Sequence, residues 1–343
     1  MKNSFVTGNV LNSVSTIPQV STGLSFKDFI GTVRVRSGIN RDQYKVDPGL
    51  YAVGSPGRES DVFVTANYKL SFDVLRKNLD GINGWILVLD TRGINVWCAA
   101  GKGTFGTKEL VNRINLVSLD KIVIHKRIVL PQLSATGVAA HKVKEETGFN
   151  VHYGPVRAAD LKKFITDGYR ADREMRKVSF GFNDRIKLIP NDFLSSKLYL
   201  IAAMAVLFLI SGISVKGFSF NDFSINGGPA VLNVLLAYIS GIVITPVLLP
   251  FIPGQMFSLK GFYSGILVFL ILLILKFKGD NLIEIISWFL IISAISSFLA
   301  MNFTGSSTYT SLSGVKKEMK VSVPFQIGFA ITGLVLQVVG KLI

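Results

Sequence analysis

The sequence predicts an α/β domain with a parallel sheet, followed by an all-α membrane domain of five transmembrane helices. Three observations favour this division. First, 47 of the 59 charged residues lie within the first 200 of 343 positions. Second, the chain from Leu198 onward contains apolar stretches close to the roughly 20 residues that cross a bilayer core. Third, short apolar runs alternate with amphipathic segments before that point, as strands and helices do in α/β folds.

Composition divides the chain into three expected segments. Residues 1–23 are rich in Ser, Thr and Val without a continuous apolar core, so we expect a flexible arm and not a secretory signal. Residues 24–195 should form the α/β domain, and residues 196–343 the membrane domain. The five transmembrane helices are expected at about 198–215, 229–252, 260–277, 284–303 and 321–341.

Basic residues predict the orientation in the membrane. Arg170, Arg173 and Arg176 belong to a basic cluster before the first span, and three lysines lie in the expected loop 304–322. The positive-inside rule assigns both regions to the cytoplasm, which agrees with five spans. We therefore expect a multi-pass protein of the cell inner (cytoplasmic) membrane with a cytoplasmic N-terminal domain. The net charge of +15 follows from this topology, and aromatic residues are not interleaved with basic ones, which argues against nucleic acid as a partner.

The expected elements of the α/β domain alternate along the chain. Candidate strands cover residues 33–36, 50–53, 62–66, 85–90, 122–124 and 149–153, and candidate helices cover 70–79, 107–115, 139–147 and 158–167. Ligands of parallel sheets bind at the carboxyl ends of the strands. We therefore expect the functional site in the loops that follow Ala66, Asp90 and Leu130.

The loop after Asp90 contains the sole cysteine, Cys98, and a cluster of three glycines. Residues 101–106 fit G-x-G-x-x-G, the pattern of dinucleotide-binding loops. Two features argue against dinucleotide binding: about ten residues separate the pattern from the strand, and no acidic residue follows about 20 positions on at a strand end. A phosphate-binding loop is excluded because Val96 stands where its first glycine belongs. Two interpretations of Cys98 stay open: a functional thiol, or a small buried hydrophobic residue, which is the usual role of a lone cysteine.

Several motifs resemble one known family. Residues 95–102, Asn-Val-Trp-Cys-Ala-Ala-Gly-Lys, resemble the signature N-V/I-W-C-A-A/G-G-K of the corrinoid proteins of mercury methylation, the HgcA family. Residues 130–135 and 153–160 resemble later segments of the same corrinoid domain, and residues 303–306 and 312–319 resemble the membrane tail. That domain is in turn related to the large subunit of the corrinoid iron–sulfur protein of the acetyl-CoA pathway.

The resemblance implies a Rossmann-like domain that binds cobalamin or a related corrinoid in the base-off form. It implies that the signature forms a helix beneath the ring, with the Cys98 thiolate as the catalytic lower axial ligand of cobalt. Thr65 and Ser134 lie on loops that should line the edge of the ring. The complete set of expected cofactor-binding residues is Thr65, Asn95, Val96, Trp97, Cys98, Ala99, Ala100, Gly101, Lys102, Gly103, Thr104, Phe105, Gly106 and Ser134.

The resemblance further implies transfer of a methyl group from methyl-Co(III) cobalamin to mercury(II), giving methylmercury. Mercury(II) is an electrophile, so the methyl group must leave with its electron pair or as a radical. An electron-rich thiolate stabilises the Co(III) left behind, because the axial ligand is a main influence of the protein on a metal cofactor.

The expected partners follow from the single cysteine. With Cys98 bound to cobalt, the chain cannot hold an iron–sulfur cluster, so the reductant must be another protein. The resemblance implies a ferredoxin-like protein with two 4Fe–4S clusters, HgcB, as reductant, and a methyl-folate methyltransferase as methyl donor.

Two other functions stay open. One is a membrane-anchored corrinoid methyl carrier of acetyl-CoA-type one-carbon metabolism. The other is a transporter with a regulatory soluble domain, although ionisable residues cluster at the span ends and transport pathways usually place them inside the bilayer. His125, His141 and His152 have no mutual spacing that suggests a metal site.

Overall fold

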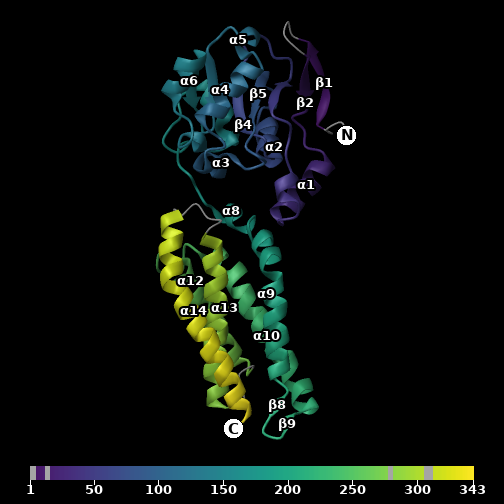
Figure 1. Ribbon diagram of the computed structural model, residues 1–343, viewed down its shortest axis with the longest axis vertical. Coiled ribbons are helices and arrows are strands. Elements are labelled where there is room, and N and C mark those ends of the chain that lie inside the picture. The colour runs from purple at the N-terminus through teal and green to yellow at the C-terminus, as the bar shows by residue number, and fades with distance from the viewer. Residues whose placement is uncertain (1–4, 12–15, 277–280, 305–311) are drawn as a thin grey trace. The chain divides into compact units, whose positions relative to one another are not determined.

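The computed structural model describes residues 5–11, 16–276, 281–304 and 312–343 (Figure 1). The chain forms two compact units. The first comprises Met1–Val35 and Ile39–Val178, and the second comprises Arg36–Gly38 and Ser179–Ile343. The second unit thus begins earlier than the expected boundary at residue 196. The reason is local: Arg185 is buried, and its guanidinium donates to the carbonyl oxygens of Phe180 and Val247 within the helical unit.

A seven-stranded mixed sheet forms the centre of the first unit (Figure 1). Its order is β1-β2-β3-β5-β4-β6-β7. The strands are β1 (Val6–Leu11), β2 (Thr16–Val20), β3 (Gly49–Val53), β4 (Val62–Ala66), β5 (Gly84–Leu89), β6 (Arg127–Leu130) and β7 (Asn150–Tyr153). Strands β4, β5, β6 and β7 run parallel, whereas β3 is antiparallel to β5. Strand β2 runs parallel to β3, so the expectation of a wholly parallel sheet is wrong at both β2 and β3. Residues 54–61 are too few for a parallel crossover from β3 to β4.

Helices cover both faces of this sheet and bury β4 and β5 completely. The helices of the unit are α1 (Phe26–Arg36), α2 (Lys69–Asn78), α3 (Val96–Lys102), α4 (Thr107–Leu116), α5 (Leu119–Ile122), α6 (Ala140–Thr147) and α7 (Leu161–Thr166). Side chains of α3, α4, α5 and α6 share one hydrophobic core, and those of α2 and α7 share the other. A strand that is buried on both faces has a nearly continuous apolar sequence, which explains why β4 and β5 could be found in the sequence.

Two expected strands are not strands. Residues 33–36 end α1, which begins after a reciprocal cap in which Ser25 and Asp28 bond each other's backbone N–H groups. Ile122 ends the short helix α5 and residues 123–124 follow it, and Ile122 and Val123 are apolar because they fill the core. The strand in this region is β6, five residues further along the chain.

The N-terminal segment expected as a flexible arm contains the edge strand β1 and its neighbour β2, which pairs with β1 and β3. Phe5, Ile17 and Val20 of this segment are buried. The buried guanidinium of Arg76 donates to the carbonyl oxygens of Ser21 and Gly23 at 2.5 and 2.8 Å. These long-range contacts hold the segment against α2. The prediction of a flexible arm was wrong because local composition does not reveal contacts between distant residues.

The second unit is helical and contains five candidate membrane spans by length and apolar composition. Its helices are α8 (Phe182–Ile186), α9 (Ile189–Ile210), α10 (Phe220–Ile239), the π-helical turn η4 (Ser240–Ile244), α11 (Thr245–Leu248), α12 (Phe257–Ile274), α13 (Leu282–Thr304) and α14 (Leu312–Lys341). A short hairpin of β8 (Ile213–Ser214) and β9 (Gly217–Phe218) separates α9 from α10.

The number of spans agrees with the sequence, but their ends differ. The first ends at Ile210 because the β8–β9 hairpin follows, and the second begins at Phe220, where the Ser219 hydroxyl caps the helix. The expected third span reached residue 277, which lies outside the described residues. Within the expected loop 304–322, residues 305–311 are also outside them, and the three lysines lie on α14 because this helix begins at Leu312.

Glycines let α12, α13 and η4 approach closely. A Cβ on Gly261 would stand 2.4 Å from the Ala300 Cβ, and one on Gly241 would stand 2.7 Å from the Leu299 Cβ. The Ser296 hydroxyl donates to the Gly261 carbonyl oxygen at 2.7 Å and lies 2.9 Å from the Ser240 hydroxyl. Small residues and interhelical hydrogen bonds are the usual basis of helix association in membranes.

Candidate functional site

The candidate site is built around α3, at the edge of the sheet where the parallel strands end. The chain leaves β5 at Leu89 and enters α3 at Val96. Helix α3 contacts β4 and the 3-10 turn η2 (Gln132–Ser134), which follows β6. The loops after β5 and β6, expected from the sequence to meet, thus lie together at this edge.

Asn67, the residue after β4, organises the loop between β5 and α3. Its buried Oδ1 accepts from the Thr91 N–H at 3.1 Å, the Thr91 hydroxyl at 2.9 Å and the Gly93 N–H at 2.9 Å. Its Nδ2 donates to Asp90 Oδ1 at 3.1 Å. One amide therefore satisfies the polar groups of a turn that would otherwise be buried without partners. Asn67 was not identified from the sequence, although its position directly after a buried strand was an available signal.

Helix α3 begins and ends with specific caps. Asn95 Oδ1 accepts from the Cys98 backbone N–H at 3.0 Å, so Asn95 is the N-cap. At the other end Gly103 has φ of 80°, the left-handed conformation that favours glycine after a helix. These two residues limit α3 to seven residues and fix Cys98 in its first turn.

The signature residues divide between two faces of α3. Ala99 and Ala100 are buried against the core, whereas Trp97, Cys98, Gly101 and Lys102 are exposed. Cys98 is a free thiol at the surface, so the interpretation of a small buried hydrophobic residue is wrong. Among the other expected residues, Asn95, Val96 and Thr104 are half-buried, Gly103 is exposed, and Phe105 and Gly106 are buried.

Gly101 leaves the surface beside Cys98 open. A Cβ built on Gly101 would meet no heavy atom of the described chain within 4 Å. An exposed glycine inside a helix costs about 1 kcal/mol relative to alanine. Packing within the described part of the chain therefore does not account for this glycine, whereas a flat ligand lying close to the helix backbone would.

A second glycine allows α3 to rest on the loop after β6. A Cβ on Gly137 would stand 2.3 Å from the Phe105 carbonyl oxygen and 3.0 Å from the Ala100 Cα. The Thr107 N–H donates to the Gly137 carbonyl oxygen at 3.2 Å. Because this contact is between backbones, residues 100–107 are held at a fixed depth above the sheet. Gly137 was not identified from the sequence, since the approach joins segments about 35 residues apart.

Two expected cofactor-binding residues lie inside the protein. Thr65 is 4% exposed and pairs with Val88 within the sheet. Ser134 is fully buried, and its hydroxyl donates to the Pro131 carbonyl oxygen at 2.8 Å. The structure therefore brings Ser134 beneath α3 as a support, and it places neither hydroxyl at the exposed face.

The surroundings of α3 are ordered by further polar contacts. Burial raises the pKa of Tyr153, whose hydroxyl donates to the Val138 carbonyl oxygen at 2.6 Å. Glu109 accepts from the Asp90 N–H at 2.9 Å and pairs with Arg113 at 2.7 Å. These contacts fix the loops that follow β5 and β6.

The histidines are engaged elsewhere or exposed. His125 Nε2 lies 3.0 Å from the Ser60 carbonyl oxygen, and His141 is exposed. Burial and the positive charge of Arg127 lower the pKa of His152, whose ring packs edge-on against Tyr169. Among the described residues, no three His, Cys, Asp or Glu side chains gather in a group that could hold a metal ion.

These features define a class of protein. Its α/β domain carries an exposed cysteine helix at the carboxyl edge of the parallel strands, and this domain is joined to a helical unit with five candidate spans. Residues 23–165 match the sequence family described as CO dehydrogenase/acetyl-CoA synthase delta subunit. This match covers most of the α/β unit and ends before the helical unit.

Curated relatives agree with this match. The acetyl-CoA decarbonylase/synthase complex subunit gamma of Archaeoglobus fulgidus is 32% identical over 139 residues, which are 39% of this chain and 29% of the relative. The corrinoid/iron-sulfur protein large subunit of Moorella thermoacetica is 29% identical over 122 residues, which are 35% of this chain and 27% of the relative. The chain spans less than a third of the length of either relative. Its α/β domain is thus related to subunits of the acetyl-CoA pathway proteins.

Proposed function

We propose that the α/β domain binds a corrinoid in the base-off form against the exposed face of α3, with the Cys98 thiolate as lower axial ligand of cobalt. We further propose that the protein transfers a methyl group to mercury(II), giving methylmercury. The observation that carries the proposal is the exposed Cys98 thiol beside the open surface of Gly101, one turn further along α3. The corrinoid named in the Moorella relative supports the choice of ligand.

The residues present fit a corrinoid. Gly101 leaves room for a flat ring system close to the helix backbone, and Trp97 and Lys102 are exposed on the same helix. Trp97 offers an apolar surface to the ring, and the Lys102 ammonium can donate to an amide or phosphate oxygen at its periphery. The buried Ala99 and Ala100 anchor this face to the core.

The chemistry depends on Cys98. A bound corrinoid supplies a methyl group on cobalt. The Cys98 thiolate would hold the cobalt of this group and supply electron density to it, which would favour transfer of a methyl group to an electrophile such as mercury(II). The Asn95 side chain would hold the thiolate in position, because it caps the turn that carries Cys98.

The remaining requirements point to partners. The sole cysteine cannot both ligate cobalt and hold an iron–sulfur cluster. A ferredoxin-like protein with two 4Fe–4S clusters, of the HgcB kind, would supply electrons, and a methyl-folate methyltransferase would supply the methyl group. The five candidate spans would anchor the protein in the inner membrane with the α/β domain in the cytoplasm.

A second candidate function is favoured by the relatives. The Archaeoglobus relative is a subunit of an acetyl-CoA decarbonylase/synthase complex. A membrane-anchored corrinoid methyl carrier of acetyl-CoA-type one-carbon metabolism would use the same face of α3. The two functions differ in the methyl acceptor and not in the cofactor.

The test is anaerobic reconstitution of the full chain with cobalamin, followed by spectroscopy of cobalt ligation and assay of mercury(II) methylation. We expect corrinoid absorbance and sulfur ligation in the wild-type protein. Cys98→Thr keeps the approximate volume but removes the soft sulfur, so we expect it to bind corrinoid without sulfur ligation and to lose methylation. A folded wild-type protein without corrinoid absorbance contradicts the cofactor, and full methylation by Cys98→Thr contradicts the thiolate ligand.

The methyl acceptor is tested separately in cells. We expect deletion of the protein to abolish mercury methylation and its re-expression to restore methylation. Mercury methylation that is unchanged in the deletion strain, with corrinoid binding confirmed in the purified protein, would favour the methyl carrier instead.

A further inference from the structure

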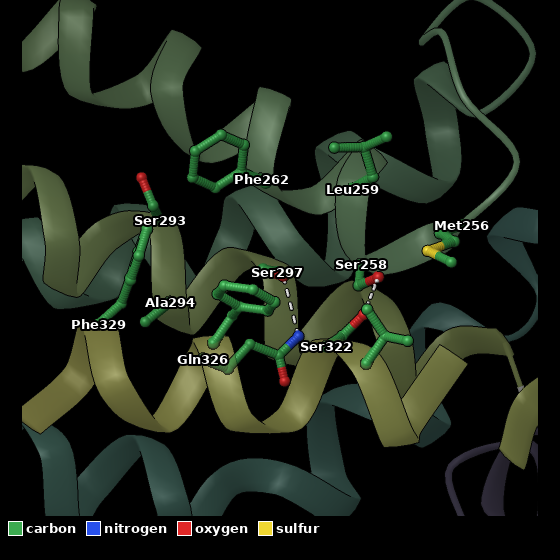
Figure 2. Close-up of a pocket in the computed structure, with 12 residues that line it drawn as sticks. Met256, Ser258, Leu259, Phe262, Ser293, Ala294, Ser297, Ser322, Gln326 and Phe329 are labelled. Carbon is green, nitrogen blue, oxygen red and sulfur yellow. Dashed lines mark hydrogen bonds between the residues drawn. The ribbon is translucent and has the colours of Figure 1, made fainter. Parts of the chain in front are cut away.

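A cavity of about 270 Å³ lies among α12, α13 and α14 in the helical unit (Figure 2). Its volume is close to the lower end of the roughly 300–1,000 Å³ typical of small-molecule sites. It belongs to three candidate membrane spans and is formed within a single unit. The proposed function of the α/β domain does not use it.

The rim and the walls of the cavity are apolar. Leu259, Val321 and Phe325 line it and are also exposed at the surface of the helical unit, Phe325 to 68%. Phe262 and Phe329 provide two further aromatic rings. Because the exposed surface of a membrane span faces lipid, a molecule dissolved in the bilayer can reach this cavity past Leu259 and Phe325.

The deeper lining is polar and nine-tenths or more buried. Gln326, 7% exposed, donates from Nε2 to the Ser297 hydroxyl at 2.9 Å. The hydroxyls of Ser258 and Ser322 lie 2.8 Å apart. Figure 2 shows the Gln326 amide nitrogen turned toward Ser297 and its oxygen on the opposite side.

Two buried polar atoms in this lining lack a partner within the described residues. They are Gln326 Oε1 and Ser293 Oγ, and both side chains line the cavity. A buried polar group without a hydrogen bond is costly, and the cost is larger in a membrane, where water is scarce. An aliphatic residue would fill position 326 without that cost, so the amide indicates a polar occupant.

We propose that this cavity binds a membrane-soluble ligand with a ring that carries a hydroxyl group, of the phenol or quinol type. The ring packs among Phe262, Phe325 and Phe329, and the hydroxyl donates to Gln326 Oε1. Ser293 provides a second hydroxyl that can donate to or accept from an oxygen of the ligand. The cavity volume limits the enclosed part of the ligand to one or two rings.

A hydroxyl is the group that best suits the Gln326 amide. If the amide is rotated by a half turn, its oxygen accepts from Ser297 and its nitrogen becomes the atom without a partner. A hydroxyl can donate to the oxygen or accept from the nitrogen, so it satisfies either orientation. A carbonyl or an ammonium group satisfies only one.

The proposal can be tested with 1-naphthol and naphthalene, which differ only in the hydroxyl group. Binding is measured by fluorescence titration of the full chain in lipid nanodiscs, with empty nanodiscs as the reference for uptake by lipid. We expect saturable binding of 1-naphthol and about tenfold weaker binding of naphthalene, because one buried hydrogen bond distinguishes them. This comparison requires only the wild-type protein.

Variants then identify the residues that bind the hydroxyl. In Gln326→Leu we expect 1-naphthol to bind no more tightly than naphthalene, because the near-isosteric side chain keeps the cavity but not the amide. Ser264→Ala is the matched control. Like Gln326, Ser264 is a buried polar residue, but it lies on α12 and does not line the cavity. It should preserve the preference for 1-naphthol.

Three results would overturn the proposal. One is uptake of 1-naphthol by protein-loaded nanodiscs equal to that of empty nanodiscs. Another is equal affinity of the wild-type protein for the two compounds, as expected of an apolar or water-filled void. The third is loss of the preference in Ser264→Ala as complete as in Gln326→Leu.

Discussion

Asn95 Oδ1 and the Cys98 backbone N–H form the hydrogen bond that begins α3, at 3.0 Å. The bond connects the residue before the helix to the residue that carries the exposed thiol. The position of the thiol therefore depends on a cap and not on the packing of its own side chain. Local order at Cys98 can thus be changed without disturbing the core of the domain.

Asn95→Ala removes this cap while leaving the helix sequence intact. We expect the amides of Cys98 and Ala99 to exchange with solvent roughly fivefold faster, since an N-cap contributes about 1 kcal/mol. Asn95→Asp keeps an acceptor oxygen and should restore slow exchange. Hydrogen exchange followed by mass spectrometry of the full chain measures both effects. Equal exchange in wild-type protein and Asn95→Ala would show that the cap does not stabilise α3.

Two substitutions of Gly101 should affect the stability of the domain and its binding of cobalamin differently. Gly101→Ala adds a Cβ that meets nothing in the described chain and improves helix propensity, so we expect the domain to gain up to about 1 kcal/mol. Gly101→Leu places a branched side chain on the face beside Cys98, and we expect it to weaken cobalamin binding at least tenfold without unfolding the domain. Cobalamin titration and urea unfolding measure the two effects. Cobalamin binding to Gly101→Leu at wild-type affinity would contradict the use of this face.

Asn67→Ala should be the most destabilising single change near the site. It leaves the buried N–H groups of Thr91 and Gly93 without their acceptor, and each such group costs about 1–3 kcal/mol. We expect the free energy of unfolding of the α/β unit to fall by about 3 kcal/mol. Asn78→Ala is the matched control, because Asn78 makes an exposed bond to its own helix. A loss no larger than that of the control would mean that the turn finds other partners.

The sequence predicted the parts of the fold whose local pattern matches their burial. Strands β4 and β5 are buried along their whole length and almost entirely apolar, and they were placed within one residue of their observed ends. Strand β1 was missed because it lies at the sheet edge, where alternate residues are exposed and Thr, Gly and Asn reduce the apolar signal. Strand β2 was missed because Thr16, Pro18 and Gln19 interrupt its apolar sequence. Their attachment depends on Arg76, more than fifty residues away.

The part of the candidate site that lies within a continuous sequence motif was predictable. Residues 95–102 were singled out because the sole cysteine lies in a distinctive run of residues. Asn67 and Gly137 were not, because each acts on a segment that is distant in sequence and adjacent only after the sheet has formed. Ser134 lies in the turn that contacts α3, but the sequence could not reveal that its hydroxyl donates to the Pro131 carbonyl oxygen.

The buried ion network of α1 and α2 should make the α/β unit sensitive to acid. Burial by itself would raise the pKa of Asp28, but hydrogen bonds from Lys69 and Ser25 outweigh it and hold the pKa well below its usual 3.8. Asp28 also pairs with the fully buried Arg76 at 2.9 Å. A carboxyl whose pKa is lower in the folded than in the unfolded chain stabilises the fold above its unfolded pKa, and this contribution is lost as the pH falls.

We therefore expect the contribution of Asp28 to the free energy of unfolding to be constant above about pH 5 and to decrease as the pH falls below about 4. Asp28→Asn should be less stable than the wild-type protein at neutral pH, because Arg76 and Lys69 lose a charged partner, and it should show a shallower decrease in acid. Asp120→Asn, at an exposed position, is the control and should follow the wild-type curve. Urea unfolding between pH 7 and pH 3, followed by the fluorescence of the buried Trp85, measures these slopes. An acid dependence of Asp28→Asn as steep as that of the wild-type protein would show that other carboxyl groups cause the acid sensitivity.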